Sequence, residues 1–150
     1  MPMSQPDALQ LLREDHRKLR NLFELAENAQ TEVERHSIFV KIRDELQAHT
    51  AIEENVFYAA FTPYENFAEL LEDCLDDHQE MKDILLEIED VGPASPDFLD
   101  QLEDLRDLVE EHLEIEESEF FPKAREVVTE DEFLRISRLL NDAREAAHRN

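Results

Sequence analysis

Apolar residues recur at alternating steps of three and four along four long stretches of the chain, the spacing of a helix that buries one face. The stripe with the most regular steps consists of Phe67, Leu71, Cys74, His78, Met81, Leu85 and Ile88. The preceding stretch places on one face Ile42, Leu46, His49, Glu53, Val56 and Ala60. A shorter stripe near the end of the chain consists of Phe133, Ile136, Leu139 and Leu140. The pattern therefore predicts four long amphipathic helices and a shorter one that covers them.

Hydroxyl residues that can accept hydrogen bonds from free backbone N–H groups mark where these helices begin. They are Ser4, Thr31, Thr62, Ser95 and Thr129. They predict helices at about 5–29, 32–61, 63–91, 96–127 and 130–148. Only one of the 150 residues is a glycine, Gly92, which argues against the tight turns of a β-protein. The expected fold is all-α: a single domain, 1–150, forming an up-down antiparallel four-helix bundle with a short fifth C-terminal helix.

Each of the four long stripes has a histidine near its middle: His16, His49, His78 and His112. Two of these histidines are followed four residues later by a glutamate, Glu53 or Glu116, which a helix places on the same inward face. Burying four imidazoles and two carboxylates without counter-ions costs many kcal/mol. A pair of divalent metal ions would satisfy all six groups, because imidazoles and bridging carboxylates are suitable ligands. The alternative is a buried His–Glu hydrogen-bond network.

The metal-ligand pattern occurs twice. The pair Asp15–His16 recurs as Asp77–His78, and the segment HTAIEENVFY at 49–58 recurs as HLEIEESEFF at 112–121. The chain is therefore interpreted as two similar helical hairpins, at about 5–61 and 63–127, that pack about an approximate two-fold axis. Each hairpin would supply two histidines and one glutamate. The second acid of each EE pair, Glu54 or Glu117, falls off the inward face and is expected in solvent.

The combined pattern H…HxxxEE…H…HxxxEE, with an aspartate before each leading histidine and Phe121–Pro122 after the last motif, resembles the hemerythrin-like HHE cation-binding domain. The resemblance covers nearly the whole chain and implies a non-haem di-iron site in a four-helix bundle. It assigns His16 and His49 to one iron, and His78 and His112 to the other. It also implies that Glu53 and Glu116 bridge the two irons together with an oxo or hydroxo group.

The chain departs from the pattern of the oxygen-carrying hemerythrins. Those proteins have a further histidine four residues after the ligand of the third helix, and an aspartate as the second bridge. Here the position four residues after His78 is Lys82, and the corresponding position after His16 is Arg20. Each iron would keep an open or water-filled position, which argues against stoichiometric oxygen carriage. Both cationic residues are expected at the solvent edge.

The resemblance implies a protein that binds or reacts with a small diatomic or peroxide ligand: oxygen, nitric oxide or hydrogen peroxide. Whether it is an enzyme stays open. The alternative is an iron-responsive regulatory or iron-storage module. A ferritin-like oxidase is disfavoured because its Glu-x-x-His motif is absent. Three residues before the four histidines stand Arg13, Leu46, Leu75 and Val109.

The charge of the chain restricts its partners. It has 39 acidic and 15 basic residues and a net charge of −24, so it should repel nucleic acid and anionic membrane surfaces. Cys74 is the only cysteine, which excludes a disulfide framework and a thiolate cluster within this chain. The first ten residues do not resemble a secretory signal, and the longest apolar run, VFYAAF, is far shorter than a membrane span. A cytoplasmic location is expected.

Overall fold

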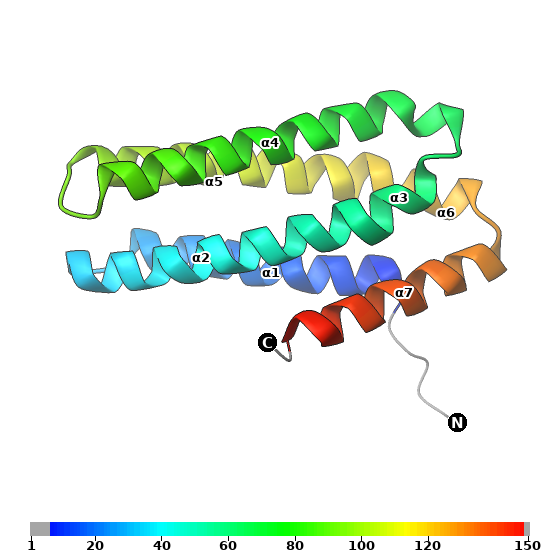
Figure 1. Cartoon of the computed structure of the whole chain (residues 1–150), viewed down its shortest axis with the longest axis horizontal. Coiled ribbons are helices and arrows are strands. Elements are labelled where there is room, and N and C mark those ends of the chain that lie inside the picture. Colours follow the sequence, from blue (N-terminus) through cyan, green and yellow to red (C-terminus); the bar gives the residue numbers. More distant parts are fainter. Residues whose placement is uncertain (1–6, 149–150) are drawn as a thin grey trace.

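The computed structural model of the protein describes residues 7–148, and all regular structure in this range is helical. Helix α1 (Ala8–Glu27) pairs with α2 (Glu32–Ile52), and α4 (Ala68–Val91) pairs with α5 (Asp97–Ile115). Figure 1 shows these two hairpins side by side, with both hairpin corners at the same end of an elongated bundle. The expected up-down antiparallel four-helix bundle with an additional C-terminal helix is confirmed.

Two of the long helices contain a π-helical segment. Helix α2 continues through η1 (Glu53–Tyr58) into α3 (Ala59–Phe61), and α5 continues through η3 (Glu116–Phe120) into α6 (Phe121–Val127). A short 3₁₀ turn, η2 (Glu65–Phe67), leads into α4. Each π segment begins at a glutamate that the sequence predicts to be a metal ligand.

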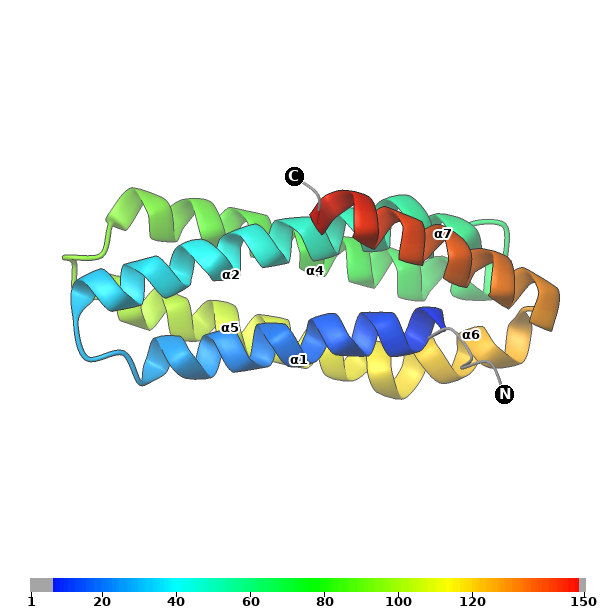
Figure 2. The same ribbon diagram turned by 90° about the horizontal axis from the view of Figure 1, so that it is seen from below.

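The last helix, α7 (Glu130–His148), runs back along α1 and α2 (Figure 2). It is anchored by the buried side chains of Phe133, Ile136 and Leu140. The Oγ of Ser137 accepts a hydrogen bond from the backbone N–H of Ala8 at 2.8 Å and donates one to the Phe133 carbonyl. Leu139 was expected in the same stripe but is 45% exposed, because residues at steps of three and four from Phe133 form the contact face and Leu139 falls beside it.

The helix starts agree only in part with the predicted caps. Thr31 and Thr129 each accept a hydrogen bond from a backbone N–H three residues later, as expected. Helix α1 instead begins at Ala8, with Asp7 as its N-cap, so a start at residue 5 is wrong and the proposed cap Ser4 lies outside the described residues. The predicted start at residue 63 is also wrong, since the Thr62 hydroxyl bonds back to the carbonyl of Tyr58 and α4 begins at Ala68.

The buried side chains form two apolar clusters, one toward each end of the bundle, with the polar layer between them. Within α1, for example, His16 lies between Leu12 of one cluster and Leu19 of the other. The inward stripe predicted for α4 is buried at every position from Phe67 to Ile88. Among residues 7–148, no helix combines the length and the apolar character needed to cross a bilayer.

The inward face of the second helix changes after Glu53. Val56 and Ala60 were expected inside but are only half-buried, whereas Phe57, Tyr58 and Phe61 are buried. A π segment has i→i+5 hydrogen bonds and so takes one more residue per turn than an α-helix. The extra residue in η1 moves the buried face along the sequence by one position, so the prediction from regular α-helical spacing was wrong there.

Candidate metal centre

All six predicted ligand residues meet in one buried layer at the middle of the bundle. The histidines come from α1, α2, α4 and α5, while Glu53 and Glu116 open the two π segments. None of the six side chains is more than 2% exposed. Two sets of donor atoms could each hold a metal ion. One set comprises His16, His49, Glu53 and Glu116, and the other comprises Glu53, His78 and His112.

The two glutamates connect the hairpins. Glu116 Oε1 lies 3.3 Å from His16 Nε2 and 3.3 Å from His112 Nε2. Glu53 Oε1 lies 3.2 Å from His49 Nε2 and 3.2 Å from His78 Nε2. Each carboxylate therefore reaches one histidine of its own hairpin and one of the other hairpin. This is the arrangement that carboxylates bridging two metals require.

Several of these atoms have no hydrogen-bond partner although they are buried. They are His16 Nε2, His49 Nε2, Glu53 Oε2 and Glu116 Oε1. Leaving a buried polar atom unpaired costs about 1–3 kcal/mol. Four such atoms in one layer, all of types that coordinate divalent metals, fit a metal centre better than a self-contained hydrogen-bond network.

Every histidine of the layer has a carboxylate at its other ring nitrogen. Asp15 lies 3.3 Å from Nδ1 of His49, and Asp77 lies 2.9 Å from Nδ1 of His112. These are the aspartates of the two Asp–His pairs, and each supports the histidine of the neighbouring helix. An acceptor at Nδ1 fixes the proton there and leaves Nε2 free to bind a metal.

The remaining two histidines are supported by Glu54 and Glu117, which the sequence analysis wrongly placed in solvent. Glu117 Oε2 lies 2.7 Å from His16 Nδ1, and Glu54 Oε2 lies 2.9 Å from His78 Nδ1. A residue next to an inward position sits about 100° round the helix, which in a bundle is the seam with the neighbouring helix rather than the solvent face. Both glutamates thus reach a histidine of the other hairpin.

Lys82, at the position where oxygen-carrying hemerythrins have a further histidine, and Arg20, at the corresponding position after His16, pair with these two carboxylates. Arg20 donates to Glu117 at 3.0 and 3.2 Å, and Lys82 lies 3.7 Å from Glu54. Both cations lie outside the ligand layer, as expected. The pKa of Glu117 falls to about 2, chiefly because of its bond to His16, and the Arg20 bond acts in the same direction.

Tyr58 is a donor that the sequence analysis left unassigned. Its hydroxyl donates to Glu116 Oε2 at 2.7 Å and lies 3.3 Å from His78 Nε2 and 3.4 Å from His112 Nε2. Ligands at about 2.1 Å from one octahedral metal are about 3 Å apart, so these distances suit a single coordination sphere. The corresponding residue of the other half is Phe121, which stacks on His16 as Tyr58 stacks on His78.

The repeat itself contained the signal that identifies Tyr58. In the aligned segments HTAIEENVFY and HLEIEESEFF the last position differs by one hydroxyl group. Regular α-helical geometry puts Tyr58 well away from Glu53, five residues earlier, but the i→i+5 bonding of η1 brings the two onto one face. Their oxygens lie 3.3 Å apart.

In the metal-free protein the pKa values of three of the histidines are raised. Burial lowers the pKa of His49, but the Glu53 charge and the Asp15 bond outweigh it and raise this pKa to about 10. The pKa values of His16 and His112 are also raised, since Glu116 and a second carboxylate outweigh burial. Burial raises the pKa of Tyr58 well above its usual value and that of the Cys74 thiol to about 12. Binding a metal would therefore displace protons from the imidazoles.

Two known proteins resemble this chain, one in sequence and one in fold. The chain is 30% identical over 115 residues to a DNA nickase from Nostoc sp. strain PCC 7120, a match that covers 77% of this chain but 32% of the relative. The chain thus spans about a third of that relative's length. Its fold matches the crystal structure of a hemerythrin HHE cation binding domain-containing protein from Mycobacterium kansasii, with a TM-score of 0.79 and 22% identity over 97% of this chain and 87% of that one.

The family comparison covers the layer completely. Residues 7–124, which include all four histidines, both glutamates and Tyr58, match the Hemerythrin HHE cation binding domain. Helix α7 follows the matched region. The chain belongs to the hemerythrin HHE cation-binding domain family.

Proposed function

We propose that the protein holds two iron ions between Glu53 and Glu116, and that this centre binds or reacts with oxygen, nitric oxide or hydrogen peroxide. The observation that carries the proposal is the convergence of four imidazole Nε2 atoms and two carboxylates in one buried layer, with several atoms unpaired. When bound, ferrous ions would supply the electrons for such a reaction. The oxo or hydroxo bridge expected from the family resemblance is part of the same proposal.

The carboxylates outside the layer prepare the imidazoles for this role. Asp15, Glu54, Asp77 and Glu117 each hold the proton of one histidine at Nδ1. The four Nε2 atoms can then donate to a metal without a change of tautomer. A centre built in this way should bind metal more tightly as the pH rises, because fewer protons compete for the imidazoles.

Tyr58 would make the two iron positions unlike each other. Its hydroxyl would complete the donor set of His78 and His112, whereas the corresponding Phe121 offers no donor to His16 and His49. We therefore place the small ligand on the side of His16 and His49. The aromatic ring of Phe121, which stacks on His16, and that of Phe57, which packs against Phe121, would shield His16 from bulk water.

The first experiment is a metal analysis combined with absorption spectroscopy of the aerobically purified protein. About two irons per chain with charge-transfer bands would support the proposal; zinc alone, or no metal, would contradict it. The reduced protein is then mixed anaerobically with each of the three ligands in turn. Reversible bands with oxygen indicate a carrier, and steady loss of peroxide indicates an enzyme. If chelation instead melts much of the helical signal, the alternative of an iron-responsive module gains support.

Nucleic acid is not part of the proposed function, although the Nostoc relative is named a DNA nickase. Most of that relative lies outside the match, and this chain has a net charge of −24, which opposes contact with phosphates. We expect no binding to nicked or intact duplex DNA at low salt. A gel-shift titration that showed binding would contradict this part of the proposal.

A further inference from the structure

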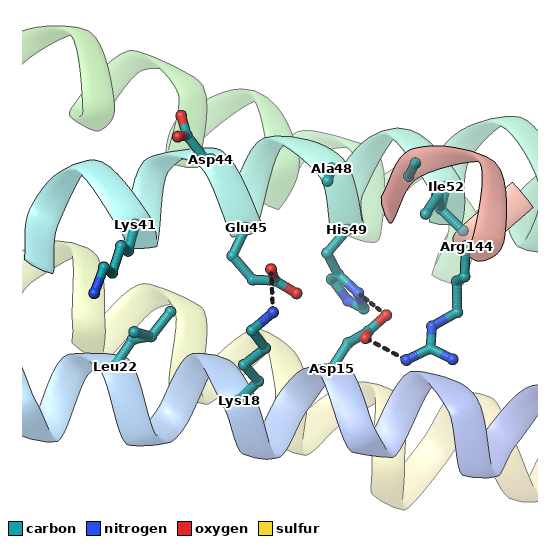
Figure 3. Close-up of a pocket in the computed structure, with 11 residues that line it drawn as sticks. Asp15, Lys18, Leu22, Lys41, Asp44, Glu45, Ala48, His49, Ile52 and Arg144 are labelled. Atoms are coloured by element: carbon teal, nitrogen blue, oxygen red, sulfur yellow. Dashed lines mark hydrogen bonds and ion pairs between the residues drawn. The ribbon is translucent and has the colours of Figure 1, made fainter. Parts of the chain in front are cut away.

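Helix α7 supplies a charged residue to the metal centre. Arg144 Nη2 donates to Asp15 Oδ1 at 2.9 Å, while Asp15 Oδ2 lies 3.3 Å from Nδ1 of His49. Figure 3 shows Asp15 between the two, with Arg144 reaching across from α7. A chain of contacts therefore runs from α7 through one carboxylate to an imidazole of the ligand layer.

The packing of α7 holds Arg144 in this position. Leu140, one turn before it on the same face, is fully buried. The Arg144 side chain is 16% exposed and forms part of the wall of a solvent-connected pocket of about 350 Å³, which is also lined by Asp15 and His49. If α7 moved away, Asp15 would lose its hydrogen bond from Arg144, and its carboxylate would face water directly.

Within residues 7–148, the second hairpin has no counterpart of the Arg144–Asp15 contact. Asp77, the counterpart of Asp15, is 28% exposed, and within residues 7–148 its recorded ion pair is with His112 alone. The pocket beside it is lined by four acidic residues and by no lysine or arginine among its described lining residues. The support of His112 is therefore independent of α7, whereas that of His49 is not.

We propose that Arg144 is a positioning residue which, through Asp15 and His49, makes retention of one of the two metal ions depend on the docking of α7. This inference rests on the proposed function. The ion held by His16 and His49 should stabilise docked α7, and undocking of α7 should release that ion first. Through this coupling, a partner protein that binds undocked α7 would respond to whether this one metal position is occupied.

The test measures metal release from the full chain. Protein loaded anaerobically with ferrous iron is mixed with excess chelator, and release is followed in the wild type and in Arg144→Gln. The variant should release one of its two ions faster than the wild type, by at most the about 10- to 100-fold that losing the Asp15–His49 contact itself would cost in affinity, and the other at the wild-type rate. Arg135→Ala, on an exposed part of the same helix, should release both at the wild-type rates.

A double-mutant cycle tests whether Arg144 acts through Asp15. In an Asp15→Asn background, Arg144→Gln should have little further effect on release. Arg144→Lys, which keeps the charge, should recover part of the wild-type retention. If Arg144→Gln does not fold, the lysine variant and hydrogen exchange of α7 in the wild type still decide: metal must slow exchange along α7, and unchanged exchange would overturn the inference.

The outcomes separate this inference from the proposed function. If the wild type binds no iron, the proposed function fails and this inference fails with it. If the wild type binds two irons and Arg144→Gln releases both at the wild-type rates, only the coupling through α7 is wrong.

Discussion

The two hairpins place nearly the same histidines and glutamates in very different surroundings. Beside His49 the pocket is lined by Asp15, Lys18, Asp44 and Ala48, and the corresponding positions beside His112 are Asp77, Glu80, Asp107 and Glu111. One pocket thus carries mixed charges and includes Arg144 and Ala147 of α7 in its wall, while the described lining of the other has four acidic residues and no residue of α7. The repeat has kept the inward face nearly constant and allowed the outer face to diverge. The two similar sets of histidines and glutamates therefore lie in chemically unequal surroundings.

Removing a glutamate shared by both hairpins should have the largest effect. Glu116→Ala deletes the carboxylate that contacts His16 of one hairpin and His112 of the other, so both metal ions should be lost. Metal content per chain is the measurement. His36→Ala, at an exposed position on α2, should keep the normal content. Normal metal in Glu116→Ala would refute the assigned centre.

Removing the outer support of one histidine should affect one half. Asp77→Asn weakens the acceptor at His112 Nδ1 and should lower the affinity for one of the two ions by about 10- to 100-fold. Competition with a chelator measures the two affinities. Asp107→Asn makes the same charge change in the same pocket without touching His112, and should leave both affinities near normal. Equal effects of the two variants would mean that only the pocket's charge matters.

Tyr58→Phe makes the two halves alike at this position. Both ions should be retained, but the ferric protein should lose any absorption band that arises from a phenolate bound to iron. The metal-free protein should lose about 1 kcal/mol of stability with the hydrogen bond to Glu116. Tyr64→Phe, at a half-buried position outside the ligand layer, is the matched control. An unchanged spectrum in Tyr58→Phe would show that the phenol does not bind iron.

The pH dependence of the metal-free protein follows from two shifted groups. His49 has a pKa raised from 6.5 to about 10, so its contribution to stability is complete below pH 6.5 and is lost as the pH rises toward 10. Glu117 has a pKa lowered from 4.5 to about 2, so its contribution is complete above pH 4.5 and is lost as the pH falls toward 2. The thermal midpoint should therefore peak between these ranges, and a midpoint that is constant from pH 6.5 to 10 would contradict the His49 assignment.

The corner between α4 and α5 contains Gly92, and changing this residue should have the smallest effect on the centre. Gly92, which follows α4, has a φ of 80° and is the sole residue with positive φ between residues 7 and 148. Gly92→Ala meets no neighbouring atom but adopts a strained backbone, which should cost about 1–3 kcal/mol. Metal content should not change. Chemical denaturation measures the loss, and an unaltered midpoint would mean that this corner relaxes.

Much of the fold and the inward position of all four histidines and both glutamates could be predicted from the sequence, because both depend on regular helical spacing. His78 could be placed from the stripe around it, and Glu53 from its distance to His49. The metal identity and the assignment of ligands to ions remain proposals. The sequence could not predict where α-helical spacing is interrupted. In the π segment η1 the buried face shifts, so that Val56 is only half-buried and Tyr58 is buried.

The helix starts and the outer contacts show a second limit. Thr62 has the sequence of a cap, but its hydroxyl is taken by the preceding helix. The role of Glu54 depends on which helix lies beside it, and spacing within one helix does not contain that information. Arg144 lies in α7, outside both repeated hairpins, and only the packing of α7 against the bundle shows that Arg144 reaches Asp15.

The exchange of Glu54 and Glu117 between hairpins has a consequence for how the protein assembles. Each hairpin carries the carboxylate that sets the proton position on a histidine of the other, so neither half can prepare its own pair of imidazoles. A newly made first hairpin would therefore be a poor metal chelator until the second hairpin docks. If the proposed centre forms, metal binding should thus come late in folding, once the two hairpins have docked.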